Sequence, residues 1–169
     1  DSVGHADRGR DDRKRLPGLE CAVGHDGAEA RHCACFLSPV WREHIRKLWT
    51  IYAETHPHIM WVEDDIRTFN HEPVEFGCFC PRHMKRFSER VGREVSREEL
   101  VRAILQPGKP HPWRREYLLM QREIMIETVA FLAKVTHETS PETCMGLMSS
   151  GPRLHCVEGR AWKRLGEAL

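Results

Sequence analysis

Three residues with metal-binding side chains lie within six positions near the middle of this sequence. Cys78, Cys80 and His83 form a C-x-C-x-x-H pattern, and Pro81 between them suits the first turn of a helix. This spacing lets a loop and the following helical turn direct all three side chains toward one ion. Zn²⁺ prefers thiolate and imidazole ligands, and a closed set of four makes a structural site. The pattern therefore predicts part of a structural zinc site.

The fourth ligand must come from elsewhere in the chain. Cys35 is the strongest candidate, because it lies just before a helix start at Ser38 and that helix leads back to the same region. Cys33, His32 and His71 are competitors. Two other interpretations stay open here: buried reduced thiols, or disulfides within the C-x-C pairs. The seven cysteines are an odd number, and no secretory segment is visible, so we expect a reducing, cytoplasmic compartment.

A second cluster carries carboxylates. Glu63, Asp64 and Asp65 directly follow the apolar run 59–62, and Arg67 comes two positions later. Three adjacent carboxylates repel one another, which favours protonation of at least one and would produce a general acid. Strand alternation would place Glu63, Asp65 and Arg67 on one face and Asp64 on the other. The positive charge of Arg67 would keep Asp65 ionised, which suits Asp65 to binding sugar hydroxyls better than to donating a proton. A solvated acidic turn with a local salt bridge is the alternative.

The elements that position these residues follow from the apolar pattern. A helix is predicted from Ser38 and Pro39 to about residue 54. The uninterrupted apolar runs 59–62 and 143–148 predict strands buried on both faces, as in a parallel sheet. Further helices are predicted over about 81–91, from Ser96 to about 105, over about 113–137, and over 158–169, whereas residues 1–30 are expected to be loop-rich.

The order helix, strand, helices, strand, helix implies parallel strands joined by right-handed crossovers. We therefore predict an α/β fold, a partial (β/α)8 TIM barrel, with residues 1–169 forming a single domain. A complete barrel needs about 250 residues, so both strands are expected to leave unpaired edges. In a barrel the chemistry lies at the carboxyl ends of the strands. His155 and Glu158 follow the second strand, where the next active-site loop would lie.

Composition excludes several classes of function. The 169 residues include 26 Lys and Arg and 25 Asp and Glu, giving a net charge of +1, which counts against nucleic-acid binding. No apolar run approaches the roughly 20 residues of a membrane span, so we expect no membrane partner. The absence of an initiator Met suggests that the chain was cut from something longer. The sequence is compatible with a homo-oligomer and does not specify one.

Two segments resemble glycoside hydrolase family 42, the β-galactosidases. Residues 31–42 (RHCACFLSPVWR) resemble that family's Arg-x-x-x-Cys-x-x-Ser-Pro-x-aromatic-Arg segment. Residues 78–83 (CFCPRH), followed by Phe87, resemble its C-x-C-x-x-C…F segment, whose cysteines bind a structural zinc with the cysteine of the first segment. Here the last cysteine is replaced by His83. The resemblance thus implies a zinc site formed by Cys35, Cys78, Cys80 and His83.

The same resemblance implies roles at the substrate site. Arg31 takes the place of a substrate-binding arginine. The family's Asn-Glu pair, in which Glu is the acid/base, corresponds to Asp64 and Asp65, so Asp65 becomes the acid/base candidate and Asp64 joins Arg67 in binding substrate. A shift of one residue would instead place Asp65 on the Asn and Ile66 on the Glu. The loop leading to Cys78 is also longer than in the family.

Family 42 enzymes are retaining glycosidases, which use a second carboxylate as nucleophile. That nucleophile follows a later strand, so we expect it to be missing from these 169 residues. The implied function is a β-galactosidase-like hydrolase of O-glycosidic bonds, with a carbohydrate substrate and a structural zinc. The alternative is a non-catalytic, zinc-stabilised module that binds a carbohydrate or a partner protein.

Overall fold

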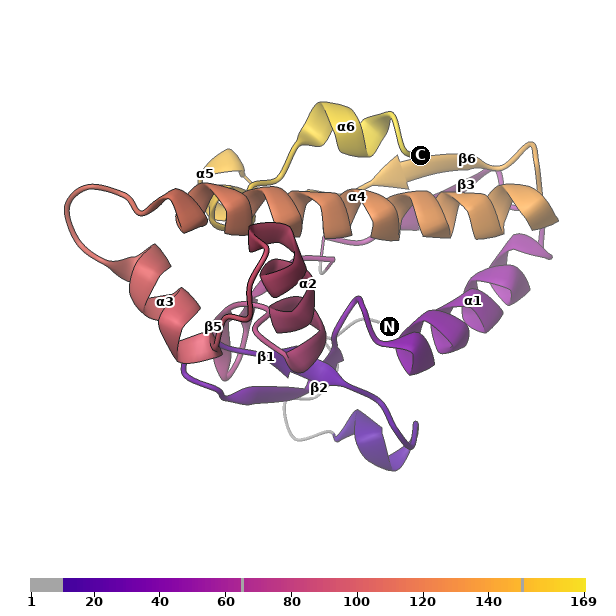
Figure 1. The fold of residues 1–169 in the computed structure, drawn as a ribbon. Helices are drawn as coiled ribbons and strands as arrows, with labels where there is room; N and C mark the ends of the chain where they lie inside the picture. Colours follow the sequence, from indigo (N-terminus) through magenta and orange to yellow (C-terminus); the bar gives the residue numbers. More distant parts are fainter. Residues whose placement is uncertain (1–10, 65, 150) are drawn as a thin grey trace.

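The computed structural model describes residues 11–64, 66–149 and 151–169, which form a mixed α/β fold. Figure 1 shows the longest helix, α4, crossing the molecule, with α1, α2 and α3 on one side and strands β3 and β6 on the other. The elements, in chain order, are η1 (Asp12–Lys14), β1 (Cys21–Val23), β2 (Glu29–Ala34), α1 (Pro39–Ala53), β3 (Ile59–Val62), β4 (Phe69–His71), β5 (Val74–Phe76), α2 (Pro81–Val91), α3 (Arg97–Leu105), α4 (Pro112–Thr139), β6 (Cys144–Leu147), α5 (Pro152–His155), η2 (Cys156–Glu158) and α6 (Trp162–Gly166).

Helix α1 begins where its sequence predicts. The Ser38 side chain caps the helix by accepting a hydrogen bond from the Trp41 backbone N–H, and Pro39 occupies the first turn. Trp41, Ile45 and Trp49 form its buried face, which packs against α4. The predicted helices along α2, α3 and α4 are likewise confirmed, with differences of one or two residues at their ends.

Strands β3 and β6 form a two-stranded parallel sheet, with Ile59 opposite Cys144 and Val62 opposite Leu147. Parallel strands are confirmed, but burial on both faces is wrong for both strands, since β6 has no buried residue. Met60 and Val62 are buried, whereas Trp61 on the other face is 56% exposed. The reason is that within the described residues these two strands do not extend into a closed barrel, so one sheet face lacks a covering layer. The structure corresponds to a partial α/β fold.

Two short antiparallel hairpins form where the sequence predicted no strand. Strands β1 and β2 pair across a turn at Gly24–Gly27, in which the Asp26 carboxylate accepts a hydrogen bond from the Ala28 N–H and Gly27 adopts a φ of 88°. Strands β4 and β5 pair directly after the acidic segment. Three of these four strands are only three residues long. A strand this short gives almost no periodic signal in a sequence.

The single helix predicted over 158–169 is also wrong. The chain instead forms α5, η2 and α6, with Gly159 in the left-handed region at a φ of 65°. A Cβ at Gly159 would lie 2.7 Å from the carbonyl oxygen of Leu118 on α4. This close approach to α4 needs a residue without a side chain, and it interrupts the helix.

Candidate metal centre

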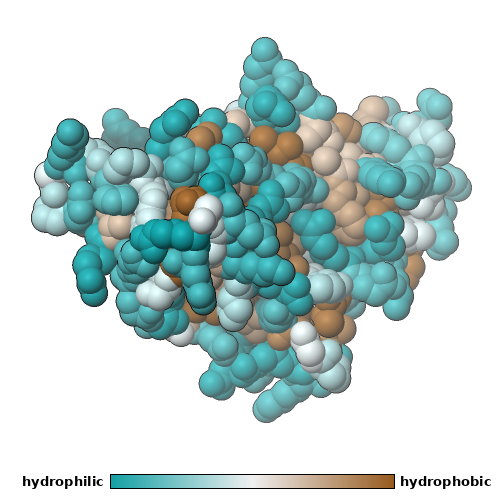
Figure 2. All heavy atoms as spheres, in the orientation of Figure 1, coloured by the Kyte–Doolittle hydropathy of each residue, from teal (hydrophilic) through white to brown (hydrophobic). Residues whose placement is uncertain are grey.

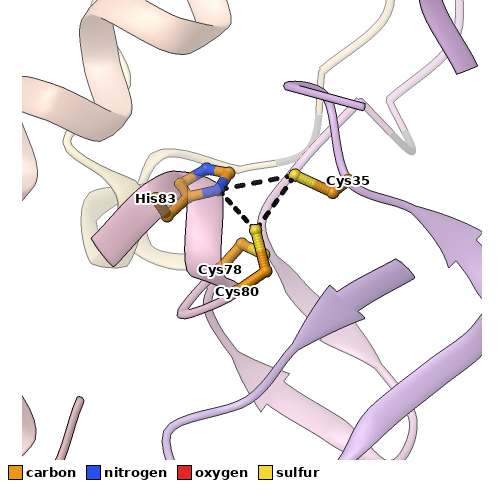
Figure 3. Close-up of side chains that lie close together, drawn as sticks. All are labelled: Cys35, Cys78, Cys80 and His83. Atoms are coloured by element: carbon orange, nitrogen blue, oxygen red, sulfur yellow. Dashed lines mark hydrogen bonds between the residues drawn. The ribbon is translucent and has the colours of Figure 1, made fainter. Parts of the chain in front are cut away.

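Three separate segments bring the four predicted metal ligands together (Figure 3). Cys35 directly follows β2, while Cys78 and Cys80 lie between β5 and α2. Cys80 is the N-cap of α2, and His83 lies in the first turn of that helix. Side chains on a helix tilt toward its N-terminus, so the His83 imidazole points back toward Cys80. The prediction that these four residues converge is confirmed.

The distances suit a tetrahedral metal ion. The Sγ atoms of Cys35 and Cys80 lie 3.4 Å apart, and His83 Nδ1 lies 3.4 Å from the first and 3.3 Å from the second. All four ligand atoms, including that of Cys78, lie within 4.8 Å of one another. Zinc–ligand bonds of about 2.0–2.1 Å to nitrogen and about 2.3 Å to sulfur in a tetrahedron would place ligand atoms about 3.5–3.8 Å apart. The cluster could therefore hold one metal ion after small side-chain movements.

Backbone groups near the cluster favour negative charge on its sulfurs, whereas burial by itself opposes that charge. All four side chains are buried. The Val23 N–H donates to Cys78 Sγ and the Leu37 N–H donates to Cys35 Sγ, both at 3.4 Å. Backbone donors of this kind stabilise negative charge on sulfur. The hairpin β1–β2 and the start of α1 thus supply a second layer of contacts around the ligands.

Without a metal cation, the cluster favours a negative Cys80 sulfur beside a positive His83 imidazole. Hydrogen bonds from Cys35, Cys78 and His83, of which the one from Cys35 is the strongest, lower the pKa of Cys80. The pKa of Cys35 is raised by its hydrogen bonds to the other two thiols and by burial. Burial acts to lower the pKa of His83, but the negative sulfurs of Cys78 and Cys80 raise it to about 10. A metal cation can bind the thiolate and the imidazole in place of the protons that they would otherwise share.

The competing fourth ligands and the disulfide interpretation do not fit the geometry, whereas the cysteines of the cluster are buried and reduced in the structure. Among the described residues, Cys33, His32 and His71 contribute no ligand atom to the cluster. All seven cysteines, which lie within the described residues, are free, so no disulfide forms within either C-x-C pair, and the Cys35 and Cys80 sulfurs lie 3.4 Å apart against the roughly 2.05 Å of a disulfide. His71 Nε2 instead lies 3.2 Å from the carbonyl oxygen of Arg67.

The acidic segment after β3 differs from its expected arrangement. The strand ends at Val62, so alternation does not continue through the carboxylates, and the chain turns with the Ile66 N–H donating to the Glu63 carbonyl. Arg67 is buried and pairs with Asp64, its Nη1 lying 3.4 Å from Oδ2. Glu63 is exposed. Asp65, the acid/base candidate, lies outside the described residues.

Arg31 lies on β2, and its side chain is exposed. Its charge contributes to lowering the pKa of Asp11, although the hydrogen bond from Arg13 is the larger cause. The substrate-binding roles expected for Arg31, Asp64 and Arg67, and the catalytic roles of Glu63 and Asp65, stay predictions.

A buried polar network at the carboxyl ends of β3 and β6 was only partly visible in the sequence. His155 and Glu158 stood out by their position after the second strand, whereas Thr68 and Arg160 did not. The four side chains are buried and joined by hydrogen bonds to the Glu158 carboxylate. The pattern Glu-Gly-Arg at 158–160, directly before a Trp-containing helix, was the available signal.

Comparisons with known proteins give one match, to a solved structure. No protein-family model matches the chain, and a search of curated proteins finds no match. The fold is similar to that of a β-galactosidase from Bacillus circulans sp. alkalophilus, with a TM-score of 0.59 and 16% sequence identity. The match covers 94% of this chain and 27% of that chain. At this identity the likeness shows that the chain shares part of that enzyme's fold.

Within the described residues, no helix has the length and apolar character needed to cross a membrane. The face seen in Figure 2 is largely hydrophilic, with smaller hydrophobic areas between the charged side chains.

Proposed function

We propose that Cys35, Cys78, Cys80 and His83 bind one structural zinc ion. Three thiolates and one imidazole are a donor set typical of zinc, and four protein ligands leave no open position for substrate or water. The ion would join the end of β2 to the start of α2, and so would order the loop between β5 and α2. The convergence of four buried ligands from distant segments carries this proposal.

We further propose that the zinc-braced chain is part of a glycoside hydrolase of β-galactosidase type. Two observations support this proposal: the fold shared with the Bacillus circulans β-galactosidase, and an acidic segment at the carboxyl end of a parallel strand. In barrel enzymes that end of the sheet carries the chemistry. The reaction would be hydrolysis of an O-glycosidic bond in a β-galactoside or a related sugar.

In this proposal Asp65 is the general acid/base, with Glu63 as the neighbouring carboxylate. Arg31, Asp64 and Arg67 bind the sugar. The Asp64–Arg67 ion pair suits this role, because a paired carboxylate and guanidinium offer acceptors and donors to adjacent hydroxyls. The nucleophile would come from a later strand of a longer protein.

Metal analysis and activity measurements test the two parts separately. Purified chain should contain one zinc per molecule, whereas no bound zinc would overturn the first part. Hydrolysis of an aryl β-galactoside should be measured with the longest natural form of the protein. Replacing Asp65 by Asn should reduce turnover by about 10²–10⁴-fold, and the exposed control Glu142→Gln should not. Unchanged turnover in D65N would remove Asp65 from the acid/base role.

Sugar binding without any turnover in the wild-type protein would favour the non-catalytic carbohydrate-binding alternative. Equilibrium dialysis with galactose and lactose, at protein concentrations above the expected dissociation constant, would detect that binding.

A further inference from the structure

A carboxylate with no exposed surface lies where the C-terminal segment of the chain meets the end of β3. Glu158 and His155 are both 0% exposed, and Arg160 is 6% exposed. Burying charged groups is unfavourable unless each is paired and hydrogen-bonded. The buried charges of Glu158 and Arg160 therefore need hydrogen-bond partners. Those partners show which segments the network joins.

Both oxygens of Glu158 have two donors. Oε1 accepts from His155 Nδ1 at 2.8 Å and from Arg160 Nε at 2.7 Å. Oε2 accepts from the Thr68 backbone N–H at 2.9 Å and from the Thr68 hydroxyl at 3.3 Å. The first pair comes from the segment of Glu158 itself, whereas the second comes from a residue 90 positions earlier. The carboxylate thus joins the segment after β6 to the segment after β3.

Arg160 extends the same connection. Its Nη2 donates to the carbonyl oxygen of Ile66, and its Nη1 lies 3.4 Å from the Ser149 hydroxyl, after β6. Glu158 and Arg160 therefore hold the residues on either side of Arg67. Arg67 in turn pairs with Asp64 and donates through Nε to the Phe69 carbonyl at 3.3 Å. Because residues 63, 64 and 66–68 belong to no strand, these side-chain contacts fix the chain where a sheet does not.

We infer that Glu158 is a positioning residue: with Arg160 it clamps the chain at Ile66 and Thr68, and so fixes Asp64 and Arg67 at the carboxyl end of β3. The role assigned to the acidic segment rests on the proposed glycosidase function, but the clamp itself does not. The connection runs between segments that are distant in sequence, since α5, η2 and α6 follow β6 and return along α4 (Figure 1). The substrate-facing segment would thus depend on a residue that does not touch substrate.

Hydrogen exchange of the zinc-loaded, 169-residue chain tests the clamp. In Glu158→Gln, the backbone amides of residues 66–69 should exchange at least about tenfold faster, because an amide side chain cannot serve as acceptor to all four donors and lacks the charge. Glu142→Gln, an exposed carboxylate, is the matched control. Zinc content should stay unchanged in both variants. Exchange in E158Q equal to that in E142Q would overturn the proposal.

Two milder variants keep the test decisive if E158Q does not fold. Arg160→Lys keeps a positive charge beside Glu158 but lacks the guanidinium fork that reaches Ile66. Thr68→Val removes the hydroxyl and keeps the backbone N–H. Both should increase exchange over residues 66–69 by less than E158Q would. Wild-type exchange rates in both variants would overturn the proposal.

Activity separates the clamp from the proposed function. If the longest natural form hydrolyses an aryl β-galactoside, E158Q should lower kcat by about 10²-fold with a much smaller change in KM, as expected for misplaced catalytic groups. An unchanged kcat would refute the positioning role. If the wild-type protein has no activity while E158Q still opens residues 66–69, the proposed function fails and the clamp stands.

Discussion

At the scale of single residues, the candidate metal site combines three cysteines with one histidine. With zinc bound, three thiolates and a neutral histidine would give a net charge of −1 in a buried site. The N–H groups of Val23 and Leu37 point at two of the sulfurs and offset part of that charge. As a metal ligand, His83 is a neutral imidazole. It would contribute one coordinate bond from a position fixed by the first turn of α2.

This geometry predicts a difference between two substitutions of His83. His83→Cys should retain one zinc per chain, because a thiolate at this position completes a four-cysteine site. His83→Ala should weaken zinc affinity by at least about 100-fold, since loss of outer-shell partners alone costs about 10–100-fold. Competition titration with a zinc chelator measures both, with the exposed His58→Ala as control. Equal affinities in H83A and H58A would contradict the assigned ligand set.

Removal of the metal should also lower stability. If zinc binds only the folded chain, free zinc at about 1,000 times its dissociation constant raises the free energy of unfolding by about 4 kcal/mol. Urea unfolding with zinc and with a strong chelator should therefore differ by about that amount. The alanine variant of His83 should show a much smaller difference. A chelator effect as large in that variant as in the wild type would point to another site.

Cys21 on β1 supplies a prediction about pH. Burial raises its pKa to about 11 from an ordinary value of 9.0, and its Sγ donates to the Arg31 carbonyl at 3.8 Å. Because the folded-state pKa is the higher one, the neutral thiol's contribution is complete below pH 9 and is lost as the pH rises toward 11. Wild-type stability should fall across this range by up to about 2 kcal/mol more than that of Cys21→Ala. Urea unfolding at several pH values measures both proteins. If the unfolding free energies of wild type and Cys21→Ala fall in parallel with pH, this prediction is refuted.

At the scale of elements, one hydroxyl joins the start of α1 to the segment just before β1. Ser38 is fully buried, and its Oγ accepts from the backbone N–H groups of both Trp41 and Glu20, each at 3.4 Å. The Cys35 carbonyl also accepts from the Ser38 N–H at 2.9 Å. The helix cap and the first metal ligand therefore belong to one turn.

Replacing this cap should cost more than replacing an ordinary one. Ser96, the cap of α3, accepts a hydrogen bond only from the Glu99 N–H among its described partners, at 3.1 Å. Ser96→Ala should lower the free energy of unfolding by about 1 kcal/mol and Ser38→Ala by about 2 kcal/mol, because two backbone donors lose their acceptor there. Urea unfolding of the zinc-loaded variants measures the difference. Equal losses would show that the Glu20 contact contributes nothing.

At the scale of the whole molecule, the parallel pair β3–β6 leaves one apolar face open. Trp61, on β3, is 56% exposed, and Met148, directly after β6, is 46% exposed. The described residues place no further strand beside either β3 or β6. Open strand edges beside exposed apolar side chains favour association with other chains.

The 169-residue chain by itself should therefore self-associate through this face. Trp61→Lys should shift the distribution toward monomer in sedimentation velocity, by at least about tenfold in dissociation constant, because it removes a large apolar side chain from the contact. Ile51→Lys on α1 is the matched control, since Ile51 is also 56% exposed. Similar shifts for both variants would mean that association does not use the sheet.

Much of the local structure follows from local sequence signals. Ser38 and Pro39 mark the start of α1, and the spacing of Cys78, Cys80 and His83 places three ligands within reach of one ion. The hairpins β1–β2 and β4–β5 were missed because three of their four strands have three residues. The break at Gly159 was missed because its cause is the backbone of α4, about forty positions earlier.

By itself, the sequence determined the ligand types, the helix starts and the two parallel strands, because metal chemistry, capping and apolar runs act over a few neighbouring positions. The sequence made Cys35 the strongest candidate for the fourth ligand, but only the tertiary structure excluded Cys33, His32 and His71 from the cluster, since that depends on how β2 approaches α2. It also revealed the Glu158 clamp and the pairing of Arg67 with Asp64. Contacts between segments 90 residues apart leave no periodic trace, because they are fixed by packing around α4 and not by neighbours in the chain.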